Sequence, residues 1–349
     1  MSDSKASSSN IKHYDLIVIG SGPAGQKASV QAAKAGRKVA LIERDRMLGG
    51  ACVHRGTIPS KTLRENALRV QRMRHTAALA EFELDEATEL ATLIDRLDQV
   101  LKSHDEYMRQ QIERNHIDRI HGRAKFLNPT QLQVDRVRGE PLLLSANDIV
   151  IASGSYPRKP DNIPVDHEHI FDSDSILSML YLPKSLVVLG GGVIASEYAS
   201  IFQALGVNVT MIDKYPRPLG FLDQDLTDTF VEEFTQMGGI WMGNTQINKV
   251  YWDGLSAVVT ECDDGSVIRS EKMLCAAGRL ANVKDLHLEN AGLSLNEQGT
   301  LSVDDQLQTA VAHIYAAGDV IGPPPHWLQP RWNRDVDPVV TPSICRSAP

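Results

Sequence analysis

Two glycine-rich runs in this sequence have the spacing of loops that bind dinucleotides. In chain order, the key positions of the two runs are Gly20, Gly22 and Gly25, and then Gly190, Gly192 and Ala195. In such a loop the first glycine permits a tight turn and the second lets the backbone approach a pyrophosphate. The third position lets the helix pack closely on the strand, and the helix N-terminus supplies free N–H groups for the phosphates. The sequence therefore predicts two dinucleotide sites.

Each run is followed, at the same spacing, by an acidic residue. Glu43 follows the first run and Asp213 the second, where a carboxylate accepts hydrogen bonds from ribose hydroxyls. An acid after the second loop favours the free 2′-hydroxyl of NAD, whereas a nearby cation accommodates the 2′-phosphate of NADP. Lys214 and Arg217 are candidates for that cation, and the alternative is that both are solvated loop residues. We expect use of both NAD and NADP, and a preference above about a thousandfold would contradict this.

The segments around each run are those that a dinucleotide-binding loop requires. A buried parallel strand reads as a short apolar run, and a glycine loop followed by an Ala-rich or apolar segment reads as the helix after it. The expected strand, helix and strand occupy residues 16–19, 26–35 and 39–42 in the first copy, and 186–189, 196–205 and 209–212 in the second. Between the copies, residues 61–115 have a helical pattern, and residues 119–151 read as short strands with a turn at Asn128-Pro129. The repeat predicts an α/β fold with two doubly wound Rossmann-like dinucleotide-binding domains.

The overall composition of the chain limits the number of domains, the partners and the cellular location that we expect. A chain of 349 residues has room for about two domains, and a net charge of −8 argues against nucleic acid and anionic membranes as partners. No apolar stretch is long enough to span a membrane, and the polar residues 1–12 read as a disordered leader without a signal core. The scattered cysteines suggest neither a metal site nor a disulfide framework, which favours a cytoplasmic location; they are Cys52, Cys262, Cys275 and Cys345.

Further motifs make the sequence resemble the pyridine nucleotide-disulfide oxidoreductase superfamily. These motifs are GGAC at 49–52, IPSK at 58–61, IASGS at 151–155, AAGR at 276–279 and YAAGDV at 315–320. The superfamily includes dihydrolipoamide dehydrogenase, glutathione reductase, mercuric reductase and the soluble pyridine nucleotide transhydrogenases. The resemblance covers residues 13–324, and it implies that the first loop binds FAD and the second binds NAD or NADP.

The resemblance also implies roles for individual side chains. Lys61 matches a lysine beside the flavin N5, and Glu197 matches the glutamate that pairs with it near the nicotinamide. Asp319 matches an aspartate that holds the ribityl and diphosphate part of the flavin. A cation beside N5 favours the reduced, more negative flavin, which gives the lysine a physical purpose. The motifs carry over further cofactor-binding candidates, which are Gly50, Gly122, Ser153, Gly154, Gly278 and Arg279.

One departure from the disulfide reductases decides the expected chemistry. Those enzymes carry two redox cysteines with four residues between them, but here Cys52 is followed at that spacing by Thr57. A single sulfur cannot form the intramolecular disulfide, so a thiol relay to a disulfide substrate is excluded at this site. Cys52 is a catalytic candidate by position, and we interpret it as a small apolar side chain near the flavin in preference to a reactive thiol.

The remaining chemistry is hydride transfer between a nicotinamide and the flavin. The motif around Cys52 and the stretches 171–177 and 221–224 resemble the soluble transhydrogenases. This implies an FAD-dependent enzyme that moves hydride from NADPH to NAD in ping-pong order at one nicotinamide site. Two alternatives stay open: a diaphorase or oxidase like dihydrolipoamide dehydrogenase without the redox disulfide, and an inactive truncated dinucleotide-binding remnant.

The resemblance sets the expected domain boundaries. We expect an FAD-binding domain at 13–160 that returns at 293–324, with an NAD(P)-binding domain at 161–292 between the two parts. The full-length family is homodimeric, and its C-terminal dimerisation domain is expected to be absent here. Residues 325–349 are irregular and Pro-rich, and back-translation in a shifted frame yields residues like those of the family at this point. We therefore interpret them as an out-of-frame tail.

Overall fold

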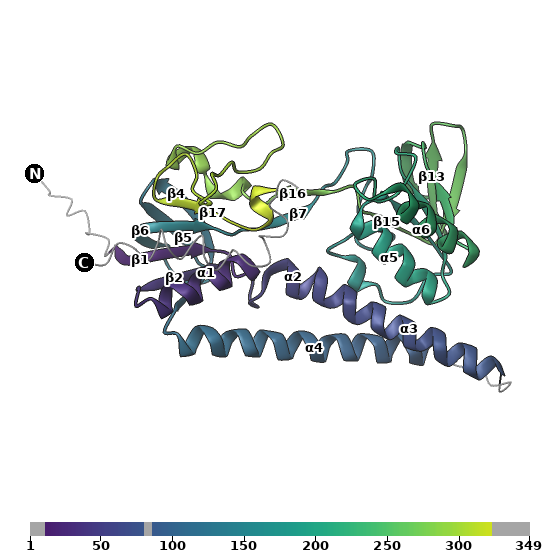
Figure 1. Ribbon diagram of the computed structural model, residues 1–349, viewed down its shortest axis with the longest axis horizontal. Helices are drawn as coiled ribbons and strands as arrows, with labels where there is room; N and C mark the ends of the chain where they lie inside the picture. Colours follow the sequence, from purple (N-terminus) through teal and green to yellow (C-terminus); the bar gives the residue numbers. More distant parts are fainter. Residues whose placement is uncertain (1–10, 80–85, 323–349) are drawn as a thin grey trace, which may run out of the picture. The chain divides into compact units, whose positions relative to one another are not determined.

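The computed structural model describes residues 11–79 and 86–322 of the chain (Figure 1). These residues divide into two compact units. The first unit contains residues 11–52, 103–156 and 280–322, and the second contains 53–79, 86–102 and 157–279. The predicted tail at 325–349 and residues 1–10 of the predicted leader lie outside the described residues, while Lys12 already begins the first strand.

A parallel sheet forms the centre of the first unit. Five neighbouring strands, in the order β3-β2-β1-β6-β17, run parallel to one another. Their bounds are Lys12–Ile19 (β1), Val39–Glu43 (β2), Asp118–His121 (β3), Leu142–Ile151 (β6) and Ile314–Ala316 (β17). The hairpin of β4 (Arg123–Asn128) and β5 (Gln131–Asp135) pairs antiparallel with β6 and turns at the predicted Asn128-Pro129. The order of the parallel strands is that of a doubly wound dinucleotide-binding fold, which confirms the predicted fold class for this unit.

The first strand and helix follow directly from their side chains. Leu16, Ile17 and Val18 are completely buried, and burial of each such side chain contributes about 1.5–3 kcal/mol. The helix α1 (Pro23–Lys34) presents Ala28 and Ala32 to β1 and β2, because small side chains allow close packing on the sheet. The strand β1 begins four residues before the predicted apolar run, because its first residues pair with the long strand β6.

The second unit repeats this construction. Its parallel sheet has the order β11-β10-β9-β15-β8, and all neighbouring strands run parallel. The strands are Ile170–Asp172 (β8), Ser185–Leu189 (β9), Asn208–Ile212 (β10), Ile240–Met242 (β11) and Lys272–Cys275 (β15). Helices α5 (Val193–Ala204) and α6 (Gln224–Gln236) follow β9 and β10, and α5 packs on both of these strands. The order β11-β10-β9 copies β3-β2-β1, so the predicted internal repeat is confirmed.

A small antiparallel sheet completes the second unit. It consists of β12 (Ile247–Trp252), β13 (Val258–Cys262) and β14 (Val267–Ser270). Two short strands, β7 (Ser155–Pro157) and β16 (Arg279–Ala281), pair where the chain passes from one unit to the other. Single 3₁₀ turns occupy Ile176–Ser178, Lys284–Leu286, Leu288–Ala291 and Asp319–Ile321.

The helical region between the repeats forms three helices, α2 (Gly50–His54), α3 (Thr57–Leu79) and α4 (Glu86–Arg114). On α3, Ala67 and Val70 pack against Ile201 of α5 and Leu205, the residue that follows this helix. This apolar contact explains why residues 53–79 belong to the second compact unit. The later part of α4 belongs to the first unit, where Met108 is buried.

The compact units differ from the sequence-based boundaries in three places. Residues 53–79 and 86–102 fall in the second unit, residues 157–160 also fall in the second, and residues 280–292 fall in the first. The difference at 280–292 arises because the Asn282 amide donates to the Ser153 carbonyl and the Asn290 amide donates to the Phe126 carbonyl, at 3.1 and 2.8 Å. The assignment of FAD to the first unit and of the nicotinamide dinucleotide to the second stays a prediction.

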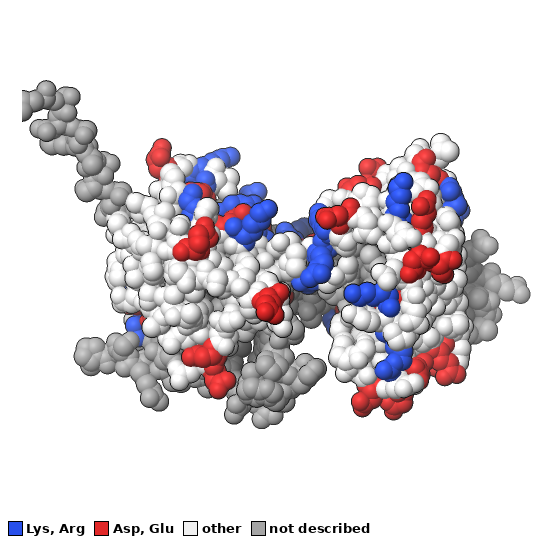
Figure 2. Space-filling view, turned by 90° about the horizontal axis from the view of Figure 1, so that it is seen from above, with Lys and Arg blue, Asp and Glu red and all other residues white. Residues whose placement is uncertain are grey.

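On the face seen in Figure 2, basic and acidic side chains are intermixed over the described residues of both units. In the described part of the chain, none of the helices combines the length and the apolar character needed to cross a membrane.

Candidate dinucleotide-binding sites

The first glycine loop lies where the strand order of its sheet reverses. It follows β1, which has β2 on one side and β6 on the other. A Cβ on Gly20 would lie 2.3 Å from the Ala152 carbonyl oxygen, and Gly20 has a φ of +103°. A Cβ on Gly25 would lie 1.9 Å from the Gly20 carbonyl oxygen. Both glycines are therefore required by the packing of the fold itself.

The second loop is built in the same way. Gly190 has a φ of +118°, and a Cβ there would lie 2.6 Å from the carbonyl oxygen of Ala276. Ala195 stands at the third position, where its methyl carbon would lie 3.6 Å from a Cβ on Gly190. The amides of Gly20 and Gly190 each donate 2.8 Å hydrogen bonds to the last residue of the apolar run of the next strand, Ile42 and Ile212. The two loops are thus equivalent in geometry as well as in sequence.

The middle glycine of each loop, Gly22 or Gly192, is not required by the packing or the backbone conformation of the described residues. Gly22 and Gly192 have extended backbones that any residue can adopt, and a Cβ at either position would meet no atom within 4 Å. Each glycine begins a helix whose N-terminus has no side-chain cap and no acidic residue in its first turn. Open space in front of free N–H groups is what a pyrophosphate fills, so both loops fit a dinucleotide.

The two acids lie at the loops as predicted from their spacing. Glu43 is buried, and its Oε2 accepts from the backbone N–H and the hydroxyl of Ser21 at 2.8 and 2.6 Å. Its Oε1 accepts from the N–H of Asp45 at 2.9 Å. Asp213 is held less firmly: its Oδ1 accepts from Tyr215 N–H, and its Oδ2 lies 3.1 Å from a Cβ position on Gly191. Each carboxylate is therefore adjacent to its glycine loop.

The residues after β6 and β17 converge on the same edge of the first sheet. Asp319 accepts a 2.7 Å hydrogen bond from the Ser155 hydroxyl, and a Cβ on Gly318 would lie 3.2 Å from that of Ala24 in α1. The Ser153 hydroxyl is buried, and the described residues offer it no hydrogen-bond partner. Gly154 has a φ of +70° and faces open space. A buried hydroxyl without a partner fits a site that a bound cofactor completes.

Two further glycine candidates have different surroundings. Gly50 has a φ of +60°, and a Cβ on it would lie 3.0 Å from the Cα of Gly22, so it lies directly beside the first loop. A Cβ on Gly122 would lie 2.7 Å from the Asp135 carbonyl oxygen. Packing against β5 therefore accounts for a glycine at position 122 without any ligand, and its role in cofactor binding stays a prediction.

Lys61 and Glu197 form an ion pair between α3 and α5. The Lys61 side chain is 62% exposed, whereas that of Glu197 is 17% exposed. The pair was predicted from the family resemblance, and the two residues are 136 positions apart in the chain. Their role beside a flavin is not shown by this contact and stays a prediction.

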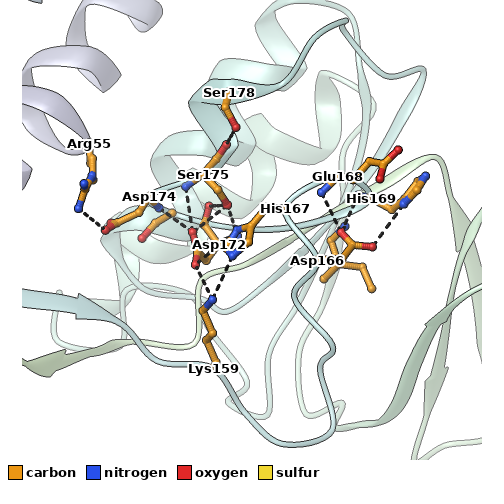
Figure 3. A network of polar contacts seen from close by, with 12 residues as sticks. Arg55, Lys159, Asp166, His167, Glu168, His169, Asp172, Asp174, Ser175 and Ser178 are labelled. Atoms are coloured by element: carbon orange, nitrogen blue, oxygen red, sulfur yellow. Dashed lines mark hydrogen bonds and ion pairs between the residues drawn. The ribbon is translucent and has the colours of Figure 1, made fainter.

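Arg279 belongs to a network of ion pairs in the second unit, and Figure 3 labels its members Arg55, Asp174 and Lys159. Its guanidinium donates to the Ser173 hydroxyl at 3.1 Å and to Asp174 at 2.9 Å, and Arg55 lies 3.6 Å from the other oxygen of Asp174. Next to Asp174, the buried Asp172 lies 3.7 Å from Lys159. Gly278, which directly precedes Arg279, has a φ of +101° and faces open space. The network anchors Arg279, which was predicted as a cofactor-binding residue.

Sequence reasoning missed the acidic members of this network. Burial alone would raise the pKa of Asp172, but hydrogen bonds from Ser175 and the nearby charges of His167 and Lys159 hold it below its ordinary value. The only sequence signal was the resemblance of the stretch 171–177 to the soluble transhydrogenases. No periodicity or spacing links these residues to their basic partners.

Arg217 is fixed in place close to the second loop. It stands between Pro216 and Pro218, which restrict its backbone, and its guanidinium donates to the buried Thr227 hydroxyl at 3.0 Å. The Leu219 N–H donates to the Gly191 carbonyl at 2.6 Å, which ties this segment to the loop. No described carboxylate forms an ion pair with Arg217, so its positive charge is available to a ligand.

The cysteines of the described residues are all free. Cys52 is half-buried in α2, and Cys262 and Cys275 are buried in the second unit. Burial raises the pKa of the Cys275 thiol, which disfavours its thiolate form. The exposed Thr57 begins α3 at the position of the second redox cysteine. The described residues also contain no cluster of side chains suited to a metal ion.

Comparisons with known proteins agree with this geometry. The family model for pyridine nucleotide-disulphide oxidoreductase matches residues 14–333. A soluble pyridine nucleotide transhydrogenase of Mycobacterium bovis (strain BCG / Pasteur 1173P2) is 40% identical over 316 residues, which are 90% of this chain and 67% of that protein. A soluble pyridine nucleotide transhydrogenase of Marinomonas sp. (strain MWYL1) is 38% identical, with the same coverage of both chains.

Solved structures show the same likeness. The Cu(II) complex of the HOCl-induced flavoprotein disulfide reductase RclA from Escherichia coli has a TM-score of 0.81 at 29% identity, covering 93% of this chain and 70% of that one. The structure of LpdA from Mycobacterium tuberculosis also has a TM-score of 0.81, at 25% identity, and covers 90% and 69% of the two chains. Together with the two dinucleotide loops, these matches show that the chain belongs to the pyridine nucleotide-disulphide oxidoreductase family of enzymes.

Proposed function

We propose that this chain is an FAD-dependent transhydrogenase that moves hydride from NADPH to NAD in ping-pong order at one nicotinamide site. The observation that carries the proposal is the pair of equivalent glycine loops, each with open space at its middle glycine. The presence of Thr57 where a disulfide reductase has its second cysteine removes the competing thiol relay. Relatives at 38–40% identity are named soluble pyridine nucleotide transhydrogenases, which supports the same activity here.

In this proposal FAD supplies a centre that accepts hydride from one nicotinamide and returns it to another. The first loop binds its pyrophosphate at Gly22, and Glu43 accepts from its ribose. The second loop binds the exchanging dinucleotide at Gly192, with Asp213 at its ribose. Lys61, oriented by Glu197, supplies positive charge where negative charge accumulates on reduction. No acid–base pair is required, so the chain acts mainly by positioning its two cofactors.

A second candidate function is a diaphorase or oxidase that passes electrons to quinones, dyes or oxygen. The likeness to a flavoprotein disulfide reductase favours it, because such a protein shares the flavin site. Steady-state assays with a quinone and with oxygen, run beside NAD as the acceptor, separate the two functions. A truncated remnant without activity is the third reading, and it predicts a protein that takes up no flavin.

The direct test is the visible spectrum of the purified 349-residue chain before and after anaerobic addition of NADPH. We expect a flavin spectrum that bleaches with NADPH and recovers when NAD is added. A flavin that bleaches but recovers only with quinone or oxygen supports the second candidate function. A colourless protein that gains no flavin on incubation with FAD contradicts the proposal.

Arg217 is expected to contribute to the acceptance of NADPH. Replacing Arg217 with alanine removes a preorganised positive charge beside the second loop, which raises the KM for NADPH by about tenfold. The KM for NADH is expected to change little, because NADH has no 2′-phosphate. Initial rates of dye reduction with each dinucleotide measure this. Equal increases for NADPH and NADH would mean that Arg217 only maintains the structure.

Cys52 is expected to be dispensable for hydride transfer. Replacing Cys52 with serine preserves the side-chain size, and Thr57 stands where the second thiol of a redox pair would be required. The variant should keep most of the wild-type rate of NAD reduction by NADPH with FAD bound. Loss of an essential nucleophile would instead lower the rate by about a thousandfold or more, and that outcome would show that the thiol-free scheme is wrong.

A further inference from the structure

A short turn at residues 48–50 lies against the first glycine loop and is held there from two sides. The N–H of Leu48 donates to Oδ1 of Asp105 at 2.8 Å, and the N–H of Gly49 donates to the Ser21 hydroxyl oxygen at 3.0 Å. A Cβ on Gly50 would lie 3.0 Å from the Cα of Gly22, so the turn abuts the middle glycine of the loop. All of these residues belong to the first compact unit.

The first anchor comes from α4, a helix with no dinucleotide motif of its own. Asp105 is 9% exposed, and its Oδ2 accepts from the guanidinium of Arg109 at 2.6 Å. Arg109 and Arg119 also donate to the carbonyl oxygen of Arg46, at 3.4 and 2.5 Å. Charge-assisted hydrogen bonds to a buried carboxylate are stronger than neutral ones, so Asp105 restrains the segment that leads into the turn.

The second anchor requires a hydroxyl group. The Ser21 oxygen accepts from the N–H of Gly49 and at the same time donates its proton to Oε2 of Glu43. A hydroxyl is both donor and acceptor, whereas an alanine at this position serves neither partner. Ser21 is 1% exposed, so water does not replace the lost bonds at low cost. The Ser21 hydroxyl thus connects the turn, the first glycine loop and the Glu43 carboxylate by hydrogen bonds.

The second repeat has no equivalent of this arrangement in its described residues. Gly191 stands where the first loop has Ser21, so Asp213 receives no bond from a loop hydroxyl. A single backbone hydrogen bond, from Leu219 to Gly191, connects the second loop to the segment that follows its acid. The first loop is therefore restrained by more bonds than the second, although the two loops are otherwise built alike.

We propose that Asp105 and Ser21 are positioning residues that hold the turn at 48–50 closed against the pyrophosphate site of the first loop. This inference rests on the proposed binding of FAD there. Restraint of the turn makes the first site one that retains its cofactor, whereas the less restrained second loop exchanges its dinucleotide in each cycle. Retention follows because a cofactor can leave only when the turn opens, which breaks both anchors.

The test uses the full chain loaded with FAD and the variants Asp105→Ala and Ser21→Ala. We expect each variant to release FAD about tenfold faster than the wild type, measured by the flavin fluorescence that appears on dilution. Asp105→Asn should show a smaller increase, because an amide oxygen still accepts from Leu48. The KM for NADPH should stay unchanged in all three variants, since the second loop is untouched.

Asp253→Ala is the matched control. Asp253 also accepts backbone N–H groups and pairs with an arginine, Arg269, but it lies in the β12–β13 hairpin of the second unit. Thermal unfolding of the FAD-free proteins separates positioning from general stability. The proposal predicts faster release in Asp105→Ala even where its unfolding temperature matches that of Asp253→Ala.

Three results would overturn the inference. The first is a wild-type rate of FAD release in both Asp105→Ala and Ser21→Ala. The second is an equal acceleration of FAD release in Asp253→Ala. The third is a rate of FAD release that simply follows the unfolding temperature across the variants. A wild-type chain that takes up no FAD overturns the proposed function together with this inference. Wild-type binding of FAD with unchanged release in the variants overturns the inference alone.

Discussion

Replacement of Lys61 with methionine is expected to slow reduction by NADPH by about a hundredfold while FAD stays bound. Methionine keeps the length of the side chain but removes the charge that Glu197 orients. The effect should fall on the transfer step, because a fixed charge stabilises the negative charge that develops during reduction. Anaerobic rapid mixing of the FAD-loaded variant with NADPH, followed by flavin absorbance, measures this step directly.

Lys61→Arg and Glu197→Gln are the matched variants. Arginine retains the charge and should retain more activity than methionine, whereas Glu197→Gln leaves the lysine charge but removes its partner. The ion pair is largely exposed on the Lys61 side, so its loss should cost less than about 1 kcal/mol of folding stability. Rates for Lys61→Met equal to those of the wild type would remove this residue from the proposed site.

Gly25→Ala and Gly22→Ala are expected to fail in different ways, although they change neighbouring positions of one loop. A Cβ at position 25 would lie 1.9 Å from the Gly20 carbonyl oxygen, so Gly25→Ala should lower the free energy of unfolding by about 3 kcal/mol. A Cβ at position 22 meets no protein atom and projects into open space. Gly22→Ala should therefore fold normally and lose FAD affinity by about a hundredfold.

Chemical denaturation of the FAD-free proteins and titration with FAD measure the two effects separately. Gly192→Ala is the matched control, because it makes the same change in the second loop. It should leave FAD binding intact and raise the KM for the nicotinamide dinucleotides. If Gly22→Ala bound FAD as tightly as the wild type, the open space in front of α1 would not be the pyrophosphate site.

The predictions from local sequence that succeeded concern short stretches of chain. The strands and helices around both glycine loops were expected to within a few residues, because apolar runs and glycine spacing act over a few neighbouring residues. Gly20 and Gly190 were expected to make tight turns, and both have positive φ. The fold class followed from the repetition of this unit and not from any single motif.

Sequence patterns gave weaker guidance where a role depends on distant partners. The pairing of Lys61 with Glu197 was available only through resemblance to a family, since no spacing links residues on separate helices. The contact of Asp105 with Leu48 had no sequence signal at all. Asp105 lies between Leu101 and Met108 on the apolar face of α4, so its burial follows the helical period, but its partner Leu48 depends on how α4 packs.

Tertiary structure also separated glycines that look alike in the sequence. Gly22 and Gly122 were both predicted to bind cofactor, yet a Cβ at position 122 would strike β5, whereas one at position 22 would meet nothing. The reason is physical. Spacing along the chain determines which turn a loop can form, but only packing between segments far apart in sequence decides whether a glycine leaves room for the protein or for a ligand.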